Sequence, residues 1–294
     1  MSDSLLITGG SGFIGRNLAE HFAPEREVLA PGHAELDLLD ADAVRDYLKK
    51  HRVDAVAHCA TKPGHRNAVD PTGLVEANTR MFFNLARCSD LYRKMVFVGS
   101  GAVYDMRHYE PKMPETYFDA HVPADEHGFS KYIAAKYIER SGDIVELRVF
   151  GIFGRYEDYA IRFISNAICK TIFGLPITLR QDRHLDYLYI DDLPQVVDHF
   201  IANDAAHTAY NVTPDAAIGL YAMAEKVRAI SGADVPIVVA GEGVGIEYSG
   251  DNARLRAEMP EWAITPVDRA IEQLHAWYCE HRDGIDRDAL LIDR

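Results

Sequence analysis

The 294-residue sequence has few cysteines, and they form no cluster. Cys59, Cys88, Cys169 and Cys279 are widely spaced, with no CxxC pair and no spacing typical of a metal site. A disulfide-built secreted scaffold is therefore disfavoured, and reduced thiols of a cytoplasmic protein are expected. We predict no metal centre.

Long apolar runs and an excess of basic residues are also missing. No run of about 18 apolar residues occurs, and no basic start is followed by an apolar segment, so neither a membrane span nor a signal peptide is predicted. The net charge of −14 disfavours a nucleic-acid-binding surface, which would need a basic excess. With 48% hydrophobic and 26% charged residues, the composition is that of a globular protein.

Short apolar runs alternate with helical patterns through the first half of the sequence. The predicted strands are Ser4–Thr8, Glu27–Ala30, Asp54–Ala60, Lys94–Ser100 and Ile144–Phe150. The predicted helices are Ile14–Phe22, Ala41–His51, Thr72–Ser89 and Gly128–Arg140. Strands that are apolar throughout and alternate with helices predict an α/β fold with a doubly wound parallel sheet, covered on both faces.

The regular alternation of predicted strands and helices ends after residue 153. Helices are predicted at Ile161–Phe173, from Leu193, near Leu220–Ser231 and after Thr265, where Thr, Pro and Asp resemble a helix-capping sequence. We expect a smaller α/β substrate domain that is partly interleaved with the first. Residues 1–153 plus about 184–213 would form a dinucleotide-binding domain, and about 154–183 plus 214–294 would form the substrate-binding cap.

A glycine loop joins the first strand to the first helix. Gly9, Gly12 and Gly15 follow Thr8 in the sequence LLITGGSGFIGRNL. Glycines at this junction permit a tight turn and let backbone N–H groups approach a pyrophosphate at the helix N-terminus. The loop therefore predicts a Rossmann-type domain that binds NAD or NADP.

The end of the second strand bears on the choice between NAD and NADP. An acid there binds the ribose 2′-hydroxyl of NAD, whereas a basic group accommodates the 2′-phosphate of NADP. The sequence LAPGHAELD has no acid before Glu35 and no arginine, and His33 is the candidate phosphate partner. NADP is favoured over NAD. Asp37 lies either near the adenine or at the surface as a helix-capping acid.

Four motifs follow one another along the sequence. They are the glycine loop, FVGSGAVYD (Phe97–Asp105), GFSKY (Gly128–Tyr132) and YLYIDD (Tyr187–Asp192). Together they resemble the extended short-chain dehydrogenase/reductases that act on nucleotide sugars. Within that group, the sequence most resembles the 4-keto-sugar reductases. The resemblance implies an NAD(P)-dependent reductase or epimerase. The candidate cofactor contacts are Thr8, Gly9, Gly12, Phe13, Ile14, Gly15, His33, Asp37, Leu38, Ala60 and Lys131.

The resemblance also implies a Ser or Thr, a Tyr and a Lys around the nicotinamide. Ser100 matches the residue that holds the substrate oxygen, and Lys131 matches the lysine. The tyrosine position, four residues before that lysine, holds His127. Since His127 and Lys131 are spaced i, i+4, they share a helix face. We take His127 as the candidate acid, with a pKa pushed below its usual 6.5 by the neighbouring ammonium.

A second register pairs Tyr132 with Lys136. Five helical steps rotate this pair by roughly 140° from the first, onto another face. Choosing it would abandon the match of Ser130 and Lys131 to the family's Ser-Lys pair. The Tyr132 register is therefore the less favoured one.

Neighbouring positions narrow the reaction that the resemblance implies. Gly101 and Ala102 stand where related dehydratases carry an acid pair, so a 4,6-dehydratase is disfavoured, and alanine also disfavours 3,5-epimerisation. Reduction of a 4-keto sugar and 4-epimerisation remain. Arginines suit a diphosphate, and the candidates for binding the substrate's diphosphate are Arg155, Arg162, Arg180 and Arg183.

His127 keeps a second functional class open. The chain would then be a weak or inactive NAD(P)-binding sensor or scaffold on the same fold. In relatives the helices predicted at Thr72–Ser89 and Gly128–Arg140 pair across a two-fold axis, and a homodimer is expected. The expected partners are a nucleotide sugar and a second copy, with no nucleic acid and no membrane.

Overall fold

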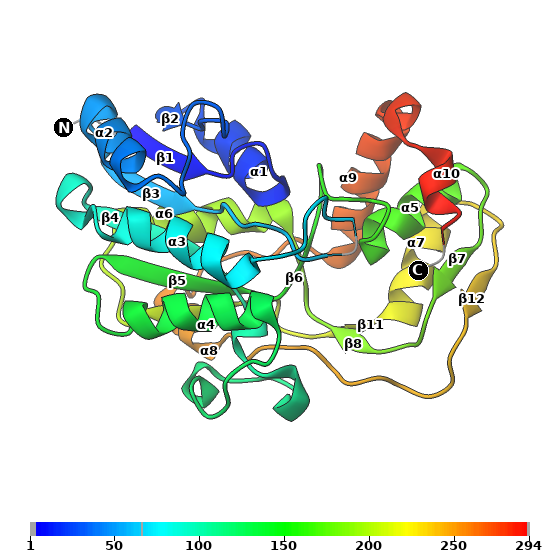
Figure 1. Ribbon diagram of the computed structural model, residues 1–294. Helices are drawn as coiled ribbons and strands as arrows, with labels where there is room; N and C mark the ends of the chain where they lie inside the picture. The colour runs from blue at the N-terminus through cyan, green and yellow to red at the C-terminus, as the bar shows by residue number, and fades with distance from the viewer. Residues whose placement is uncertain (1–3, 66, 293–294) are drawn as a thin grey trace.

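The structure is a computed structural model that describes residues 4–65 and 67–292. A six-stranded sheet occupies one side of the molecule, and a group of smaller elements lies beside it (Figure 1). In the described ranges, no helix is long and apolar enough to cross a membrane. All four cysteines are free thiols.

The six-stranded sheet has the order β10-β5-β4-β3-β1-β2, and every neighbouring pair in it is parallel. The strands are β1 (Ser4–Thr8), β2 (Glu27–Leu29), β3 (Ala55–His58), β4 (Lys94–Ser100), β5 (Ile144–Val149) and β10 (Ala209–Val212). The order reverses between β1 and β3. In such sheets, ligands bind beyond the carboxyl ends of the strands at this switch point.

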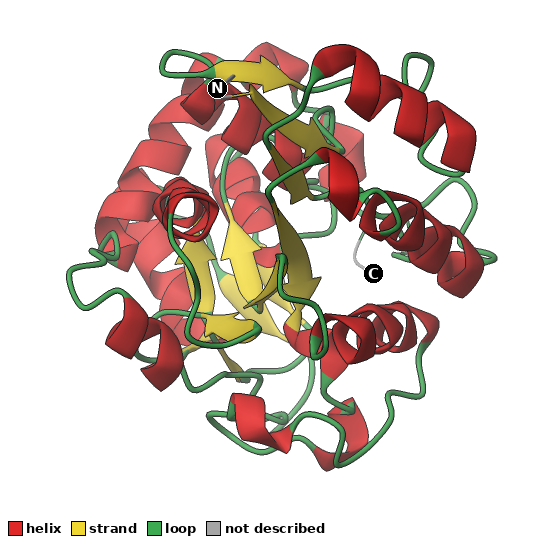
Figure 2. Cartoon of the chain, turned by 90° about the vertical axis from the view of Figure 1, so that its left-hand side faces the viewer, coloured by secondary structure: helices red, strands yellow, loops and turns green. Residues whose placement is uncertain are grey.

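Helices cover both faces of the sheet, as the second view shows (Figure 2). One face packs against α1 (Phe13–Phe22) and α6 (Leu193–Ala202). The other packs against α2 (Ala41–His51), α3 (Leu74–Ala86) and α4 (Glu126–Ile138). The predicted doubly wound Rossmann-type fold is therefore confirmed.

The remaining elements form three small two-stranded sheets and further helices. The strand pairs are β6 (Gly151–Phe153) with β9 (Tyr187–Tyr189), β7 (Ile177–Leu179) with β12 (Ile237–Val239), and β8 (His184–Leu185) with β11 (Ile218–Gly219). The helices are α5 (Phe163–Ile172), α7 (Leu220–Ser231), α8 (Ala253–Glu258), α9 (Val267–Glu280) and α10 (Arg287–Leu290). Short 3₁₀ turns are η1 (Ser89–Leu91), η2 (Gly101–Val103), η3 (Met106–His108), η4 (Glu115–Tyr117), η5 (Ile190–Asp192) and η6 (Arg282–Gly284).

The chain crosses between these two groups of elements. After β6 it enters α5 and β7, and it then returns through α6 to β10 at the edge of the main sheet. We use "cap" for α5, β7, β8, β11, α7, β12, α9 and α10. The division into two domains at the stated boundaries stays a prediction.

The predicted helix cap before the last long helix is wrong. Pro266, not Thr265, precedes the first helical residue, and no side chain caps this end among the described residues. The Thr265 hydroxyl instead donates to Asp192 Oδ1 at 2.6 Å, and its amide donates to Asp192 Oδ2 at 3.0 Å. A long-range partner on η5 has thus replaced the local one.

Candidate active site

The glycine loop is tightly folded against the start of the segment after β3. Gly9 has a φ of +69°, and a Cβ there would lie 2.9 Å from Ala60 N and Cα. A Cβ on Gly15 would lie 2.2 Å from the Gly9 carbonyl oxygen. At Gly12 the nearest atom would be that same oxygen, at 3.3 Å. The loop therefore needs glycine at 9 and 15 for its own folding, whereas a Cβ at Gly12 would make one tight contact, with the Gly9 carbonyl oxygen.

The open side of the loop fits a pyrophosphate. Helix α1 begins directly after Gly12, and no side chain among the described residues caps it. Its first-turn N–H groups are therefore left for an anion, which the helix dipole also favours. Phe13 and Ile14 start this helix. The loop geometry is what a dinucleotide cofactor requires.

Thr8 supports the loop from below. Its hydroxyl is buried, lies 2.7 Å from His58 Nδ1, and accepts hydrogen bonds from the amides of Cys59 and Ala60, each at 3.2 Å. Burial, together with the Lys131 charge, lowers the pKa of His58 to about 3. Thr8 therefore ties the ends of β1 and β3 together, and its hydroxyl is already engaged within the protein.

The segment after β2 carries the other candidate contacts. His33 has a side chain that is 82% exposed, and its Nε2 lies 3.9 Å from Asp37 Oδ1. Asp37 accepts from the Leu39 amide at 2.9 Å, and Leu38 is buried in the core. The cap of α2 is Asp40, not Asp37. His33 is thus free to approach a 2′-phosphate, although Asp37 stands beside it.

Ser100 is the last residue of β4, and Lys131 approaches the same strand two residues earlier. The Ser100 hydroxyl accepts from the Ala102 amide at 3.1 Å and so opens η2. Lys131 comes from α4 and is 7% exposed. Its ammonium donates to the Val98 carbonyl at 2.9 Å and lies 4.5 Å from the centre of the Phe97 ring. Burial lowers the pKa of Lys131 to about 8.

His127 stands one helical turn before Lys131 and is half-buried. Burial lowers its pKa to about 4; Lys131 and Arg162 also lower it, whereas Asp125 raises it. Asp125 caps the same helix by accepting from the Gly128 amide at 2.8 Å. The imidazole is therefore neutral at neutral pH, and it is a better proton acceptor than donor there.

Tyr132 and Lys136 lie together on another part of α4. The Tyr132 hydroxyl bonds to Asp119, and Lys136 Nζ lies 2.9 Å from the other oxygen of the same carboxylate. The Asp119 bond raises the pKa of Tyr132. This pair is engaged with the loop that precedes α4 and lies away from the partners of Lys131.

The four candidate arginines separate into two groups. Arg155 pairs with Asp191 at 3.3 Å and with Glu20 at 3.9 Å, so its charge is already matched. Arg162 lies just before α5 and acts on His127 through its charge. Arg180 and Arg183 instead line a cavity of about 1060 Å³ in the cap.

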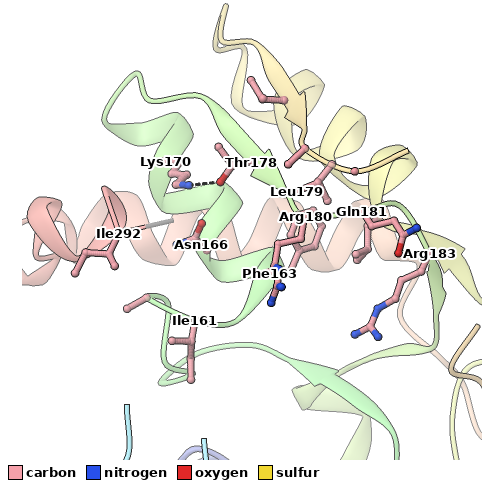
Figure 3. Close-up of a pocket in the computed structure, with 15 residues that line it drawn as sticks. Ile161, Phe163, Asn166, Lys170, Thr178, Leu179, Arg180, Gln181, Arg183 and Ile292 are labelled. Atoms are coloured by element: carbon pink, nitrogen blue, oxygen red, sulfur yellow. Dashed lines mark hydrogen bonds between the residues drawn. The ribbon is translucent and has the colours of Figure 1, made fainter. Parts of the chain in front are cut away.

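This cap cavity lies between α5, β7 and the segment after β12. Its lining combines apolar groups such as Phe163 and Leu179 with amides of Asn166 and Gln181. Both arginine side chains extend toward the side of the cavity where Ile161 lies (Figure 3). Lys170 also lines the cavity and donates to the Thr178 hydroxyl. A partly apolar hollow with two arginines suits a flat base that is joined to a diphosphate.

Tyr248 is a site residue that no local pattern predicted. A Cβ on Gly101 would lie 2.5 Å from its hydroxyl, and its ring packs 5.0 Å from the ring of Phe150. Burial raises its pKa, while the Ser100 hydroxyl and the Arg183 charge lower it. Its amide donates to the His184 carbonyl at 2.9 Å, so Tyr248 lies between the strand that follows Arg183 and the turn that follows Ser100. No repeat or spacing marks it in the sequence, because its contacts are all distant along the chain.

The comparison with family models fits this geometry. The model of the NAD dependent epimerase/dehydratase family matches residues 5–213. The chain belongs to this family. Its cofactor is accordingly NAD(P), and the resemblance predicted from the four motifs is confirmed. The glycine loop, the open amides of α1 and Lys131 are the parts of this chain that would hold the cofactor.

Curated relatives and solved structures give the same picture. GDP-L-fucose synthase of Azorhizobium caulinodans is 40% identical over 88 residues, which are 29% of this chain and 28% of that protein. GDP-L-colitose synthase of Yersinia pseudotuberculosis is 22% identical over 222 residues, covering 68% of this chain and 72% of that protein. The structure of MlghC, GDP-mannoheptose C4 reductase from Campylobacter jejuni with NADP bound, matches with a TM-score of 0.81 and 18% identity, over 95% of this chain and 98% of that one. That last likeness shows the shared fold.

Proposed function

We propose that the protein reduces the 4-keto group of a GDP-linked sugar with NADPH. The observation that carries the proposal is the link between two sites. Arg180 and Arg183 line the cap cavity, and the amide of Tyr248 donates to the carbonyl of His184, the residue after Arg183, at 2.9 Å. The Tyr248 hydroxyl lies against η2, which begins after Ser100. A nucleotide diphosphate in the cavity would thus place its sugar at the end of β4. The names of the relatives favour GDP as the nucleotide.

Each residue at the end of β4 has a role in this reaction. Ser100 would hold the keto oxygen, and His127 as imidazolium would give that oxygen a proton. Lys131 would hold the nicotinamide ribose, and its charge lowers the pKa of His127. The bound reduced cofactor supplies the hydride. The absence of an acid at the end of β2, together with the exposed His33, favours NADP over NAD.

The surroundings of Gly101 favour reduction over related reactions. A side chain at this position would meet the Tyr248 hydroxyl at 2.5 Å and the Phe150 ring at 2.7 Å, so a dehydratase-type acid has no room. The rings of Phe150 and Tyr109 lie 5.0 and 5.1 Å from that of Tyr248.

Replacing Arg183 by alanine should weaken the binding of a GDP-sugar at least about tenfold, because a charge-assisted hydrogen bond to phosphate contributes about 1.5–3 kcal/mol. NADPH affinity should stay the same. Titration calorimetry with GDP-mannose measures the first effect, and the same titration with NADPH measures the second. Keto-reductase activity is followed by NADPH absorbance with a GDP-4-keto sugar.

The matched control is Arg269→Ala. Arg269 is an exposed cap arginine paired with Glu272, away from the cavity lining. This variant should bind GDP-sugars normally. If Arg183→Ala and Arg269→Ala bind GDP-mannose equally well, the cavity is not the nucleotide site. NADPH binding without any binding of GDP, UDP or dTDP compounds would instead support the sensor or scaffold class.

We further propose a cytoplasmic homodimer that pairs through α3 and α4. The outer side of α4 exposes Phe129 and Tyr137, which are 37% and 43% exposed, and the Tyr137 ring lies 5.4 Å from that of Phe83 on α3. Sedimentation at micromolar concentration should show a dimer, and Tyr137→Glu should shift it to a monomer because a charge would enter the apolar contact. Tyr221→Glu, at a 40% exposed tyrosine of α7, should leave the dimer intact. A monomeric unmodified protein would contradict this assembly.

A further inference from the structure

An acid and a base lie on β5 under helix α4. Glu146 is 0% exposed and Arg148 is 2% exposed, although the rest of this strand is apolar. Arg148 Nε donates to Glu146 Oε2 at 2.9 Å. A buried carboxylate needs such compensation, because removing it from water is costly.

The second oxygen of Glu146 is unused by hydrogen bonds. Oε1 has no hydrogen-bond partner among residues 4–65 and 67–292. A Cβ on Gly99 would lie 2.7 Å from this oxygen, so glycine at 99 makes the room that the carboxylate fills. Lys131 reaches the same place from α4, since its ammonium bonds the carbonyl of Val98, the residue before Gly99. The ammonium and the carboxylate oxygen thus border the same peptide of β4, although in the described part of the chain they form no ion pair within 4.0 Å.

The titratable groups at the end of β3, His58 and Cys59, add no charge beside Lys131. Burial lowers the pKa of His58 to about 3 and raises that of Cys59 to about 12, so both are neutral at pH 7. On α4 itself the remaining ionisable groups are His127, Glu126, Tyr132, Lys136 and Tyr137. The elements packed against α4 add Tyr104 after η2, Lys94 on β4, Arg148 on β5, and the exposed pair Glu76 and Arg80 on α3. Burial raises the pKa of Glu146, whereas the charge of Arg148 lowers it. Glu146 is the carboxylate that most opposes the effect of burial on Lys131.

We propose that Glu146 is a positioning residue: its carboxylate is the counter-ion that keeps Lys131 an ammonium, and thereby keeps it able to hold the cofactor. Lys131 is too deeply buried to obtain this charge compensation from water. The inference rests on the proposed role of Lys131, but it does not depend on the substrate or on turnover.

The test is the pH dependence of NADPH binding. An ammonium should bind the cofactor better than an amine, so the dissociation constant should rise once the pH exceeds the pKa of Lys131, which is about 8. Glu146→Gln keeps the shape of the side chain and removes its charge, leaving Arg148 to repel the ammonium. The bend in log Kd against pH should therefore move down by at least about one unit, with about tenfold weaker binding at pH 8. NADPH fluorescence measures Kd between pH 6 and 9.5.

The control is Glu157→Gln in the segment before α5. Glu157 is also buried, accepts from the Ser165 hydroxyl at 2.6 Å and has a pKa raised to about 8, mainly by burial. Because it titrates in the same range but does not act on Lys131, its variant should keep the bend where it was. Lys131→Met should abolish the bend.

Two results would overturn the proposal. One is an unchanged bend in Glu146→Gln, which would mean that Glu146 is uncharged and only fills space. The other is weaker binding by the same factor at every pH, which would indicate a structural role alone. If the glutamine variant does not fold, Glu146→Asp is the second test. Aspartate keeps the negative charge but places it farther from Lys131, so the bend should move in the same direction by a smaller amount. A bend that stays in place in Glu146→Asp would also contradict the proposal. Failure to bind GDP-sugars would affect the proposed function without changing this outcome.

Discussion

Replacing His127 by phenylalanine should lower the turnover of a keto sugar about 10²–10⁴-fold, the usual contribution of a positioned acid–base group. The ring keeps the packing of the half-buried imidazole and removes its proton-carrying nitrogens. Ser100 and Lys131 remain, so NADPH affinity should change little. Steady-state kinetics with a GDP-4-keto sugar and NADPH fluorescence test the two parts.

The pH dependence should distinguish the two directions of the reaction. Reduction needs the imidazolium, and a pKa of about 4 leaves it as about one part in a thousand at pH 7. Reductive turnover should therefore fall roughly tenfold per pH unit above about pH 5. Oxidation uses the neutral imidazole as base. It should be nearly independent of pH above about pH 5 and lost as the pH falls through 4.

Two further variants control this prediction. Tyr132→Phe should be nearly silent, because the Tyr132 hydroxyl bonds Asp119 and not a group at the end of β4. A large loss in Tyr132→Phe with none in His127→Phe would show that the other register is used. If His127→Phe leaves activity unchanged and His127→Tyr raises it, the histidine at the family's tyrosine position weakens the site. The sensor or scaffold class requires this result.

The sheet was predictable because its strands carry their own signal. Five of its strands are apolar runs between helical patterns, and the observed bounds of strands and helices differ from the predicted ones by only a few residues. The strand predicted at Asp54–Ala60 is shortened to Ala55–His58, and the helix predicted at Thr72–Ser89 is shortened to Leu74–Ala86. Glycine, proline and polar residues at the ends leave such boundaries loosely defined. The capping prediction at Thr265 failed because its hydroxyl bonds Asp192, which is 73 residues away.

The predicted site separates in the same way. The shared helix of His127 and Lys131 and the fold of the glycine loop follow from spacing within one helix or turn. The catalytic and cofactor roles of these residues stay predictions. Tyr248 reaches Ser100 from the cap, and the charge of Arg155 is matched by Asp191, which only the folded chain reveals. The sequence does contain a signal for Glu146, because Glu and Arg alternate with apolar residues in the strand sequence IVELRV. Such alternation in a strand buried on both faces indicates a polar pair held inside the protein.

Replacing Gly12 by valine should remove cofactor binding without unfolding the protein. Gly12 has φ −86° and ψ 174°, an extended conformation that valine adopts readily, and a Cβ there would meet only the Gly9 carbonyl, at 3.3 Å. The added side chain would fill the space in which a pyrophosphate approaches the first turn of α1. Losing one or two charge-assisted hydrogen bonds, at about 1.5–3 kcal/mol each, corresponds to roughly 10- to 10⁴-fold weaker NADPH binding.

Gly15→Ala provides the contrast for this prediction. Its Cβ would lie 2.2 Å from the Gly9 carbonyl oxygen, so the loop itself must shift, and overpacking of this kind costs about 1–3 kcal/mol or more. This variant should lose thermal stability and binding together, whereas Gly12→Val should keep the melting temperature of the unmodified protein in the absence of cofactor. Calorimetric melting and NADPH and NADH titrations separate the two effects. Gly12→Val that binds both cofactors normally would remove the glycine loop from the cofactor site.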